Sequence, residues 1–132
     1  MSTTDTATDT ATDALNTLAR RYIALWNEPD PVVRHALVDE LFAPDCAHFT
    51  PSREVRGRAD MVARVADAHD RWVAPGSHRF RAVPDADGHH GTVRFHWEMV
   101  EVATGTAVSV GFDFLVLDAA GLIAGDHQFI DR

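Results

Sequence analysis

Residues 108–117 read Val-Ser-Val-Gly-Phe-Asp-Phe-Leu-Val-Leu, and this stretch decides what the rest of the chain has to form. It is rich in β-branched and aromatic residues, which predicts a long strand that is covered for much of its length. A single carboxylate, Asp113, interrupts the apolar run. A charge inside a covered strand is costly unless it is paired, solvated in a cavity or neutralised by protonation. Which of the three applies to Asp113 depends on the strands and helices around it.

Strand patterns also occur on both sides of this stretch. These patterns predict strands over about residues 78–83, 92–102, 106–117 and 122–130, and the turns between them are rich in Gly, Asp and Pro. A short extended segment over residues 46–51 comes earlier in the chain. Strands that follow one another through short turns predict an antiparallel sheet.

Three helices are predicted before this sheet. Residues 14–27 carry apolar side chains at helical spacing, and Pro29 and Pro31 follow. Asp30 and Pro31 supply an N-cap and a first-turn proline for a second helix to about residue 42, with Val33, Val38, Leu37 and Leu41 as its apolar face. The third helix covers about residues 59–73, with Val62, Val65, His69 and Trp72 on one side.

The turn between the two longest strands decides which residue lies opposite Asp113. A two-residue turn at Thr104-Gly105 would place His96 there, whereas a three-residue turn over 103–105, with Gly105 left-handed, would place Phe95 there. A β-branched threonine resists the positive φ that two-residue turns need. We therefore predict the three-residue turn. It puts Asp113 on one face with Phe95, Trp97, Met99, Ser109 and Gly111, where the glycine leaves room for a ligand to approach.

Length and composition indicate a single globular domain. Residues 1–13 repeat Thr, Ala and Asp without a large apolar side chain, so we expect a disordered acidic tail followed by a domain over 14–132. The net charge of −8 argues against nucleic acid as a partner. The chain has no basic leader, no bilayer-spanning apolar run and one cysteine, Cys46, and these features favour a cytoplasmic protein without membrane contact.

Several motifs of the chain belong together: Arg21-Tyr22-Ile23-Ala24-Leu25-Trp26-Asn27, Phe42-Ala43-Pro44-Asp45, Pro51, Val55-Arg56-Gly57-Arg58 and the hairpin over residues 112–129. They resemble the NTF2-like superfamily, and most closely its SnoaL-like branch, which includes polyketide cyclases and has ketosteroid isomerases as relatives. The resemblance covers about residues 14–131. It implies an α+β cone, in which a curved antiparallel sheet wraps around three N-terminal helices and encloses an apolar pocket.

The resemblance also implies roles for individual residues. In ketosteroid isomerases a tyrosine and a protonated aspartic acid donate hydrogen bonds to an enolate oxygen; the matching residues are Tyr22 and Asp113. The general base of those enzymes is an aspartate before a proline, and here Thr50 stands in that place, which threonine cannot fill. His48, two residues earlier, and Asp126, on the last strand, are the alternatives for a base.

The predicted site therefore has a catalytic set and a wall. The catalytic set is Tyr22, His48, Asp113 and Asp126; the ligand-binding wall is Trp26, Thr50, Phe95, Trp97, Met99, Gln128 and Ile130. The competing interpretation of Asp113 is a carboxylate paired with Arg94 or Arg79. Arg53, Arg56 and Arg58 form a basic cluster that would suit an acidic substrate. We expect neither a metal nor a cofactor, because the sequence has no His or Cys run at ligand spacing.

Two functions fit these predictions. The first is a cofactor-free isomerase, cyclase or dehydratase that acts by acid–base chemistry on an apolar, enolisable molecule of polyketide or steroid type. The alternative is a non-catalytic domain that binds a small ligand, which the threonine at position 50 favours. Val110, Phe112, Phe114 and Val116 would form an apolar outer face of the sheet, so we also expect a homodimer.

Overall fold

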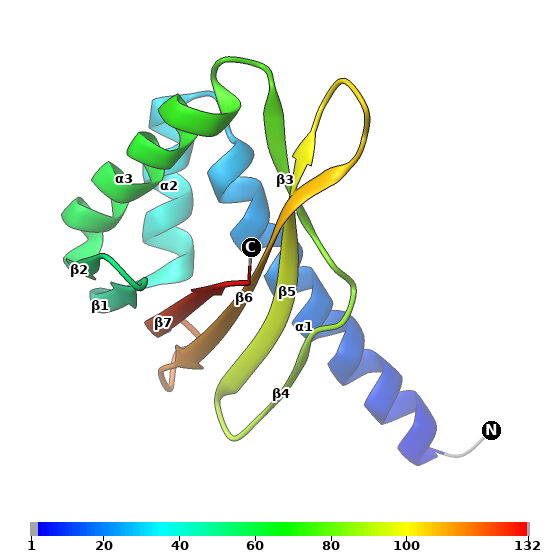
Figure 1. The fold of residues 1–132 in the computed structure, drawn as a ribbon. Helices are drawn as coiled ribbons and strands as arrows, with labels where there is room; N and C mark the ends of the chain where they lie inside the picture. Colours follow the sequence, from blue (N-terminus) through cyan, green and yellow to red (C-terminus); the bar gives the residue numbers. More distant parts are fainter. Residues whose placement is uncertain (1–2, 132) are drawn as a thin grey trace.

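Three helices cover one side of a curved sheet (Figure 1). The structure, a computed structural model, describes residues 3–131, with side chains from residue 11 onward. The helices are α1 (Thr3–Asn27), α2 (Pro31–Leu41) and α3 (Gly57–Ala68), and a π-helical turn, η1 (His69–Val73), continues α3. The strands are β1 (Phe42–Phe49), β2 (Glu54–Arg56), β3 (His78–Ala82), β4 (Asp87–His89), β5 (Thr92–Glu101), β6 (Ala107–Leu117) and β7 (Ile123–Ile130).

Helix α1 begins earlier than the sequence predicted. The helix was expected to start at Ala14, whereas it starts at Thr3. Residues 11–14 are exposed, so burial does not explain the longer helix. A helix already anchored by one half extends at little cost, because propagation is far easier than nucleation. Residues 1 and 2 of the predicted tail lie outside the described residues, and a division into tail and domain at residue 13 stays a prediction. The inner face of α1 is the expected one, with buried side chains at Ala19, Tyr22, Ile23, Leu25 and Trp26.

The start of α2 is as predicted, and its buried face differs at one position. The Asp30 carboxylate accepts a hydrogen bond from the Val32 backbone N–H at 2.9 Å, and a proline opens the helix. Val33 was expected in the core but is 39% exposed. Arg34 is buried instead, because its guanidinium folds back and donates to the backbone carbonyl of Glu28 at 2.9 Å.

The third predicted helix divides into α3 and the π-helical turn η1. The Ala74 backbone N–H donates to the carbonyl of His69, which closes the wider turn. His69 is buried, and its Nδ1 lies 3.2 Å from the backbone oxygen of Trp26 at the end of α1. This contact joins η1 to the helix that carries Tyr22. Single π-helical turns are frequent at functional sites.

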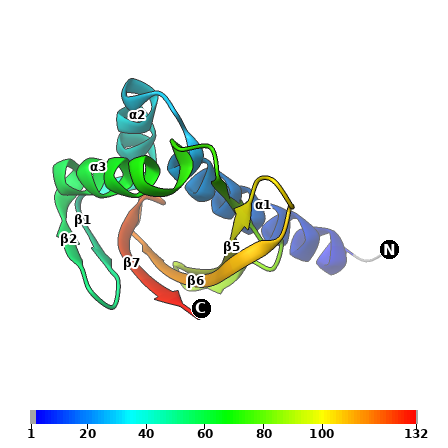
Figure 2. The same cartoon turned by 45° about the horizontal axis from the view of Figure 1, so that its top comes forward.

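The sheet has the order β2-β1-β7-β6-β5-β3, and β4 pairs with β5. Figure 2 shows how β7, β6 and β5 bend around the space below α3. The prediction of an antiparallel sheet was wrong at one pairing, because β1 lies parallel to β7. No hairpin joins these two strands, so no turn set their direction in the sequence. The three-residue strands β2 and β4 were not predicted, since they are too short to show alternation.

The pairing of β5 with β6 confirms the predicted register. Phe95 lies opposite Asp113, Trp97 opposite Gly111 and Met99 opposite Ser109. Gly105 is left-handed, with φ +71°. The turn is nevertheless one residue longer than predicted, because the Glu101 N–H already donates to Thr106. A register shift that passes over Val108 compensates for the extra residue.

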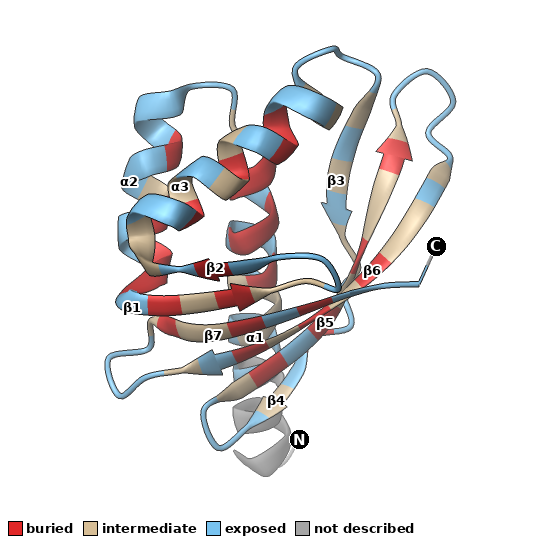
Figure 3. Cartoon of the chain, turned by 60° about the vertical axis from the view of Figure 1, so that its left-hand side comes forward, coloured by how far each residue is buried: buried red, intermediate tan, exposed pale blue. Residues whose placement is uncertain are grey.

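Buried residues gather where the helices face the sheet, and they alternate with exposed ones along the strands (Figure 3). Among the largest fully buried side chains are Tyr22, Phe42, Phe95, Leu25, Met61 and Leu115. This core holds α1 and α3 against the concave side of the sheet. Within the described residues, no helix combines the length and apolar character that crossing a bilayer requires.

Candidate functional site

Four polar side chains from four different elements meet in the interior. Tyr22 comes from α1, His48 from β1, Asp113 from β6 and Asp126 from β7. His48 is the parallel-strand partner of Asp126, and Asp113 pairs with Gln128 two residues further along β7. All four are at most 1% exposed. The structure therefore brings together the whole catalytic set predicted from the sequence.

A chain of short hydrogen bonds joins these four side chains. The Tyr22 hydroxyl oxygen lies 2.9 Å from Asp113 Oδ2 and 2.6 Å from Asp126 Oδ2. His48 Nδ1 lies 2.7 Å from the same Asp126 oxygen. A tyrosine has one hydroxyl proton and can donate to only one carboxylate. Both tyrosine contacts are satisfied when protonated Asp113 donates to Tyr22, and Tyr22 donates to an ionised Asp126.

The electrostatics of the pair agree with this distribution of protons. Burial raises the pKa of Asp113 well above its ordinary value of 3.8, and the neighbouring Asp126 raises it further. Burial also raises the pKa of Asp126, but hydrogen bonds from Asp113 and Tyr22 oppose that shift. Burial and the two carboxyls raise the pKa of Tyr22 well above 10, so the phenol keeps its proton. Asp113 is the carboxyl that holds the shared proton.

His48 is a neutral member of this network. Burial lowers its pKa from 6.5 to about 4, and the positive charges of Arg64 and Arg53 add to that shift. The Nδ1–H then donates to Asp126, which leaves Nε2 as an acceptor. In the part of the chain that the structure describes, neither His48 Nε2 nor Asp126 Oδ1 has a hydrogen-bond partner.

The second oxygen of Asp113 is held from the other side. Trp97 Nε1 donates to Asp113 Oδ1 at 2.6 Å, and Gln128 Nε2 donates to the same atom at 3.4 Å. Gly111 makes room for this contact, since a Cβ there would lie 2.1 Å from two carbons of the Trp97 ring. The sequence prediction that a ligand approaches beside Gly111 was therefore wrong, because the indole fills that space. The alternative arginine pairing is also wrong for Arg94, whose guanidinium pairs with Asp87 at 3.4 Å.

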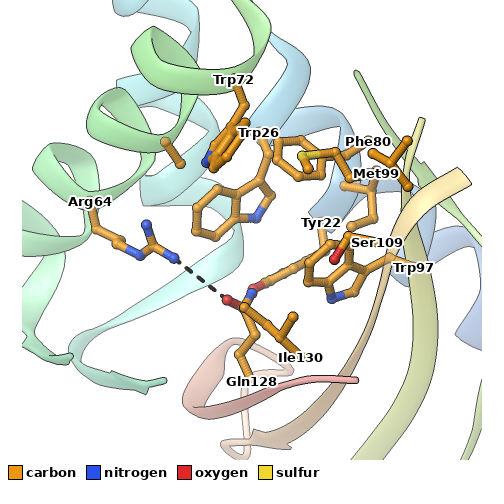
Figure 4. A pocket seen from close by; sticks show the side chains of 13 residues that line it. Tyr22, Trp26, Arg64, Trp72, Phe80, Trp97, Met99, Ser109, Gln128 and Ile130 are labelled. Carbon is orange, nitrogen blue, oxygen red and sulfur yellow. Dashed lines mark hydrogen bonds between the residues drawn. The ribbon is translucent and has the colours of Figure 1, made fainter. Parts of the chain in front are cut away.

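A cavity of about 390 Å³ lies beside the network, between the helices and strands β5, β6 and β7 (Figure 4). This volume is within the range of small-molecule sites. Its wall is largely apolar, and all three tryptophans of the chain line it. Five of the residues predicted to contact a ligand do line this cavity: Trp26, Trp97, Met99, Gln128 and Ile130.

The other predicted residues lie elsewhere. Phe95 is buried behind the wall and packs edge-on against the Tyr22 ring, with centroids 5.5 Å apart. Thr50 lines an adjoining cavity of about 270 Å³. Of the catalytic set, Tyr22 lines the main cavity, whereas the three ionisable groups behind it are not among the described residues of its wall. Tyr22, Trp97 and Gln128 thus connect the cavity to the buried acids, and of these three Tyr22 contacts both Asp113 and Asp126.

The sequence family follows from a match that spans most of the chain. A family model described as the SnoaL-like domain matches residues 19–125. The chain belongs to this family. No curated protein matches the chain in sequence.

Solved structures extend the likeness of this SnoaL-like domain. A candidate isomerase of the SnoaL-like family from Agrobacterium tumefaciens strain C58 is 28% identical, with a TM-score of 0.80 over 88% of this chain and 96% of that one. A candidate polyketide cyclase from Sinorhizobium meliloti is 13% identical, with a TM-score of 0.63 over 85% and 93%. A de novo designed protein with a curved β-sheet is 11% identical, with a TM-score of 0.68 over 91% and 87%. Together with the family, these structures confirm the predicted α+β cone of NTF2-like type.

Two residues that line the cavity were not predicted to contact a ligand. Arg64 and Trp72 both line the cavity, together with Ala68 between them. Trp72 had been assigned to the inner face of the third helix, but Arg64 had no predicted role. Residues four apart share one face of a helix, so the spacing 64, 68, 72 is the signal that would have found Arg64.

The basic cluster predicted at the start of the third helix is largely engaged in surface contacts. Arg53 pairs with Asp67 at 2.9 Å, and Arg56 lies within ion-pair distance of Glu54, its Nε donating to Glu54 Oε1 at 2.7 Å. Arg58 donates to the backbone carbonyl of Phe42 at 3.0 Å. Only Arg53 of the three lines either of the two cavities described above.

The same network contains atoms at metal-ligand spacing. His48, Asp113 and Asp126 each offer one ligand atom, and these atoms lie within 4.8 Å of one another. Sequence spacing had given no sign of this set, because each residue comes from a different strand. The donors around the set fit protons better than a cation, since Trp97 Nε1–H and the Tyr22 hydroxyl both point at its carboxyl oxygens. Hydrogen bonds from these two donors occupy lone pairs of the carboxyl oxygens, which leaves fewer of them for a cation.

Proposed function

We propose that this SnoaL-like domain is a cofactor-free enzyme that moves protons on a small, apolar, enolisable molecule, as an isomerase, cyclase or dehydratase. The observation that carries the proposal is the position of the Tyr22 hydroxyl, hydrogen-bonded to a neutral carboxyl on one side and to an ionised one on the other. Tyr22 also lines a cavity whose wall is largely apolar. The candidate isomerase from Agrobacterium tumefaciens, with its TM-score of 0.80, supports the same class of reaction.

In this proposal Tyr22 passes protons in both directions. When a substrate C–H is broken, its proton goes to the tyrosine oxygen as the hydroxyl proton moves to Asp126. When the enolate is protonated, Tyr22 gives up its proton and receives one from Asp113. Donor–acceptor distances of 2.6 and 2.9 Å suit both transfers. His48 holds Asp126 in place through Nδ1–H and stays neutral. The proton that Tyr22 has taken from the substrate then points at the oxyanion and stabilises it. After the enolate is protonated, Asp126 passes its proton through Tyr22 back to Asp113, which restores the starting state.

Hydrogen–deuterium exchange tests the proposal without knowledge of the natural substrate. The probes are 2-tetralone and cyclohex-3-enone in D₂O, with loss of the α-proton signal followed by NMR. We expect exchange catalysed by the native protein, reduced by about 100-fold or more in Tyr22→Phe, as for loss of a general acid–base group. Asp45→Asn, an exposed aspartate outside the site, should exchange like the native protein. Equal rates for the native protein and Tyr22→Phe would refute the proposal.

A second function is favoured by one specific observation. His48, Asp113 and Asp126 are 0% exposed, and Thr50 occupies the position where related isomerases have their base. These features suit a domain that binds a small ligand without converting it. Experiment distinguishes the two functions, because a binding domain would show saturable binding of an apolar ligand and no exchange of its α-protons.

A further inference from the structure

We infer that Arg64 forms an anion-binding end of the cavity, with its guanidinium stacked on the Trp26 ring, and that the ligand is an amphiphilic carboxylate: an apolar body carrying one carboxylate group. The inference rests on the proposal that this cavity receives a small molecule, and it names the chemical class of that molecule. It depends on which polar groups of the wall already have partners and which do not.

Arg64 is a cation without a counter-ion in the described part of the chain. Several other arginines pair with carboxylates, as Arg53 does with Asp67, Arg81 with Glu98 and Arg94 with Asp87. No carboxylate of the described residues lies within ion-pair distance of Arg64. Its guanidinium reaches only the amide oxygen of Gln128, at 3.5 Å (Figure 4). That distance is at the outer limit of a hydrogen bond.

The surroundings of Arg64 make it costly to leave its charge without a partner. The guanidinium lies over the Trp26 ring, 5.2 Å from its centroid, and its Nε is buried without a partner among the described residues. Burial lowers the pKa of Arg64 and nearby Arg53 lowers it further, whereas Asp67 and Asp126, both beyond ion-pair distance, oppose that shift only in part. Arginine remains charged in proteins, so the cost of burying this guanidinium is offset by a bound anion and not by loss of a proton. A carboxylate matches the guanidinium fork with two parallel hydrogen bonds.

Trp26 adds a second unpartnered donor to the wall of the cavity, away from the arginine end. Its indole Nε1 is buried and has no hydrogen-bond partner in the part of the chain that is described. In Figure 4 this nitrogen lies on the side of the ring that faces Tyr22 and Trp97. An indole N–H donates and never accepts. The unpartnered polar groups on the wall are thus both donors, and they call for a ligand whose polar atoms are acceptors.

The adjoining cavity strengthens the positive character of this end. It shares Arg64, Ala68, Trp72 and Ile130 with the main cavity, so the two meet at Arg64. Arg53 and Arg71 also line it, against a single aspartate, Asp67. The protein as a whole carries a charge of −8, so a local excess of arginine is a departure from its general surface. A local excess of positive charge beside a cavity favours the entry of anions.

The rest of the cavity sets the character of the remaining ligand. Trp72, Phe80, Met99 and Ile23 contribute apolar surface to the wall. A carboxylate held at Arg64 would direct the apolar body along this surface, with its far part against Tyr22. The arginine would therefore orient the substrate for the proposed proton transfers without taking part in them.

Isosteric pairs of a carboxylate and its carboxamide test this inference. The probes are trans-cinnamate with cinnamamide, 3-phenylpropanoate with 3-phenylpropanamide, and cyclohexylacetate with cyclohexylacetamide. Calorimetric titration at low salt should give at least tenfold tighter binding of one or more carboxylates over the matched amide. Arg64→Gln should abolish that preference while leaving amide binding unchanged.

Arg79→Gln is the matched control, because Arg79 is exposed on β3 and lies outside both cavities. Its preference should equal that of the native protein. A native preference that fails to decrease between 20 and 300 mM NaCl would also contradict a charged contact, and this measurement needs no variant. Equal affinities within every pair, a preference that survives in Arg64→Gln, or no binding at all would overturn the inference. Binding needs no turnover, so this result is independent of the exchange assay with ketones.

Discussion

Asp113 is kept neutral by its surroundings, and this makes its effect on stability depend on pH. Its pKa is raised in the folded protein, so between the ordinary value of 3.8 and the raised value the folded protein holds a proton that the unfolded chain has lost. The stabilisation is complete below the ordinary pKa and is lost as the pH rises through this window. The loss is at most about 1.4 kcal/mol per pH unit.

Asp113→Asn removes this dependence, because the amide is neutral at every pH and can still donate toward Tyr22. We expect the native protein to lose unfolding free energy relative to the variant as the pH rises from 4 toward 8, with the variant at least as stable near neutrality. Urea unfolding of both proteins across this range measures the difference. Asp45→Asn provides the exposed control, and a native–variant difference that is flat with pH would contradict the assignment of the shared proton to Asp113.

His48 should be neutral throughout the physiological range. Burial lowers its pKa to about 4, so between 6.5 and 4 the unfolded chain takes up a proton that the folded protein does not. Its contribution to stability therefore falls as the pH falls through that window. Nitrogen-detected NMR should find His48 as the Nδ1–H tautomer, titrating near pH 4. An imidazolium signal at pH 6 would mean that His48 and Asp126 form an ion pair instead.

At the residue scale, sequence pattern predicted which face a side chain occupies better than what it contacts. Alternation placed Asp113, Trp97 and Gln128 on one face, and the pairing confirms it. It could not predict that the Trp97 indole would lie on Gly111 and bond Asp113, because this depends on side-chain rotamers across two strands. The sequence also could not show that Arg64 lacks a carboxylate partner, since this depends on which carboxylates the fold places near it.

Strands β5 and β6 owe their close contact at the site to a glycine. A Cβ at Gly111 would lie 2.1 Å from the Trp97 ring, whereas a Cβ at Gly125 would meet Val116 at an ordinary 3.6 Å. We expect Gly111→Ala to cost about 1–3 kcal/mol, as overpacking does, and to displace the indole from Asp113. Gly125→Ala is the matched control and should be nearly neutral. Thermal or urea unfolding gives the energies, and tryptophan fluorescence reports the ring; similar losses in both variants would contradict the role of Gly111.

At the element scale, most of the long helices and strands could be predicted from the sequence. Features that depend on tertiary neighbours could not. Helical spacing and caps located α2, and strand patterns located β5, β6 and β7 within a residue or two. The parallel pairing of β1 with β7 was missed because parallel partners are distant in the chain and no turn specifies them. The extension of α1 to Thr3 was missed because Thr, Ala and Asp show no apolar period, and a helix that is anchored further on does not need one.

On the scale of the whole molecule, the outer face of the sheet carries exposed apolar side chains. Phe129 is 52% exposed and Val116 is 39% exposed. Phe112, the cross-strand partner of Phe129, stands 6.0 Å from it, centroid to centroid. An apolar strip of this kind on one face of a small domain is typical of a surface that is covered by a partner. The partner that we propose is a second copy of the chain.

We expect a homodimer at micromolar concentration, formed through this outer face, because pairing two such strips removes apolar area from water on both copies. Phe129→Ser should shift the protein toward the monomer, as measured by sedimentation equilibrium. Val32→Ser is the matched control, since Val32 is 77% exposed on α2, away from the sheet. The cavity lies on the opposite, helix-covered side, so the Phe129 variant should keep its ligand affinity while losing its partner. A monomeric native protein, or a dimer that withstands Phe129→Ser, would show that this strip is not the interface.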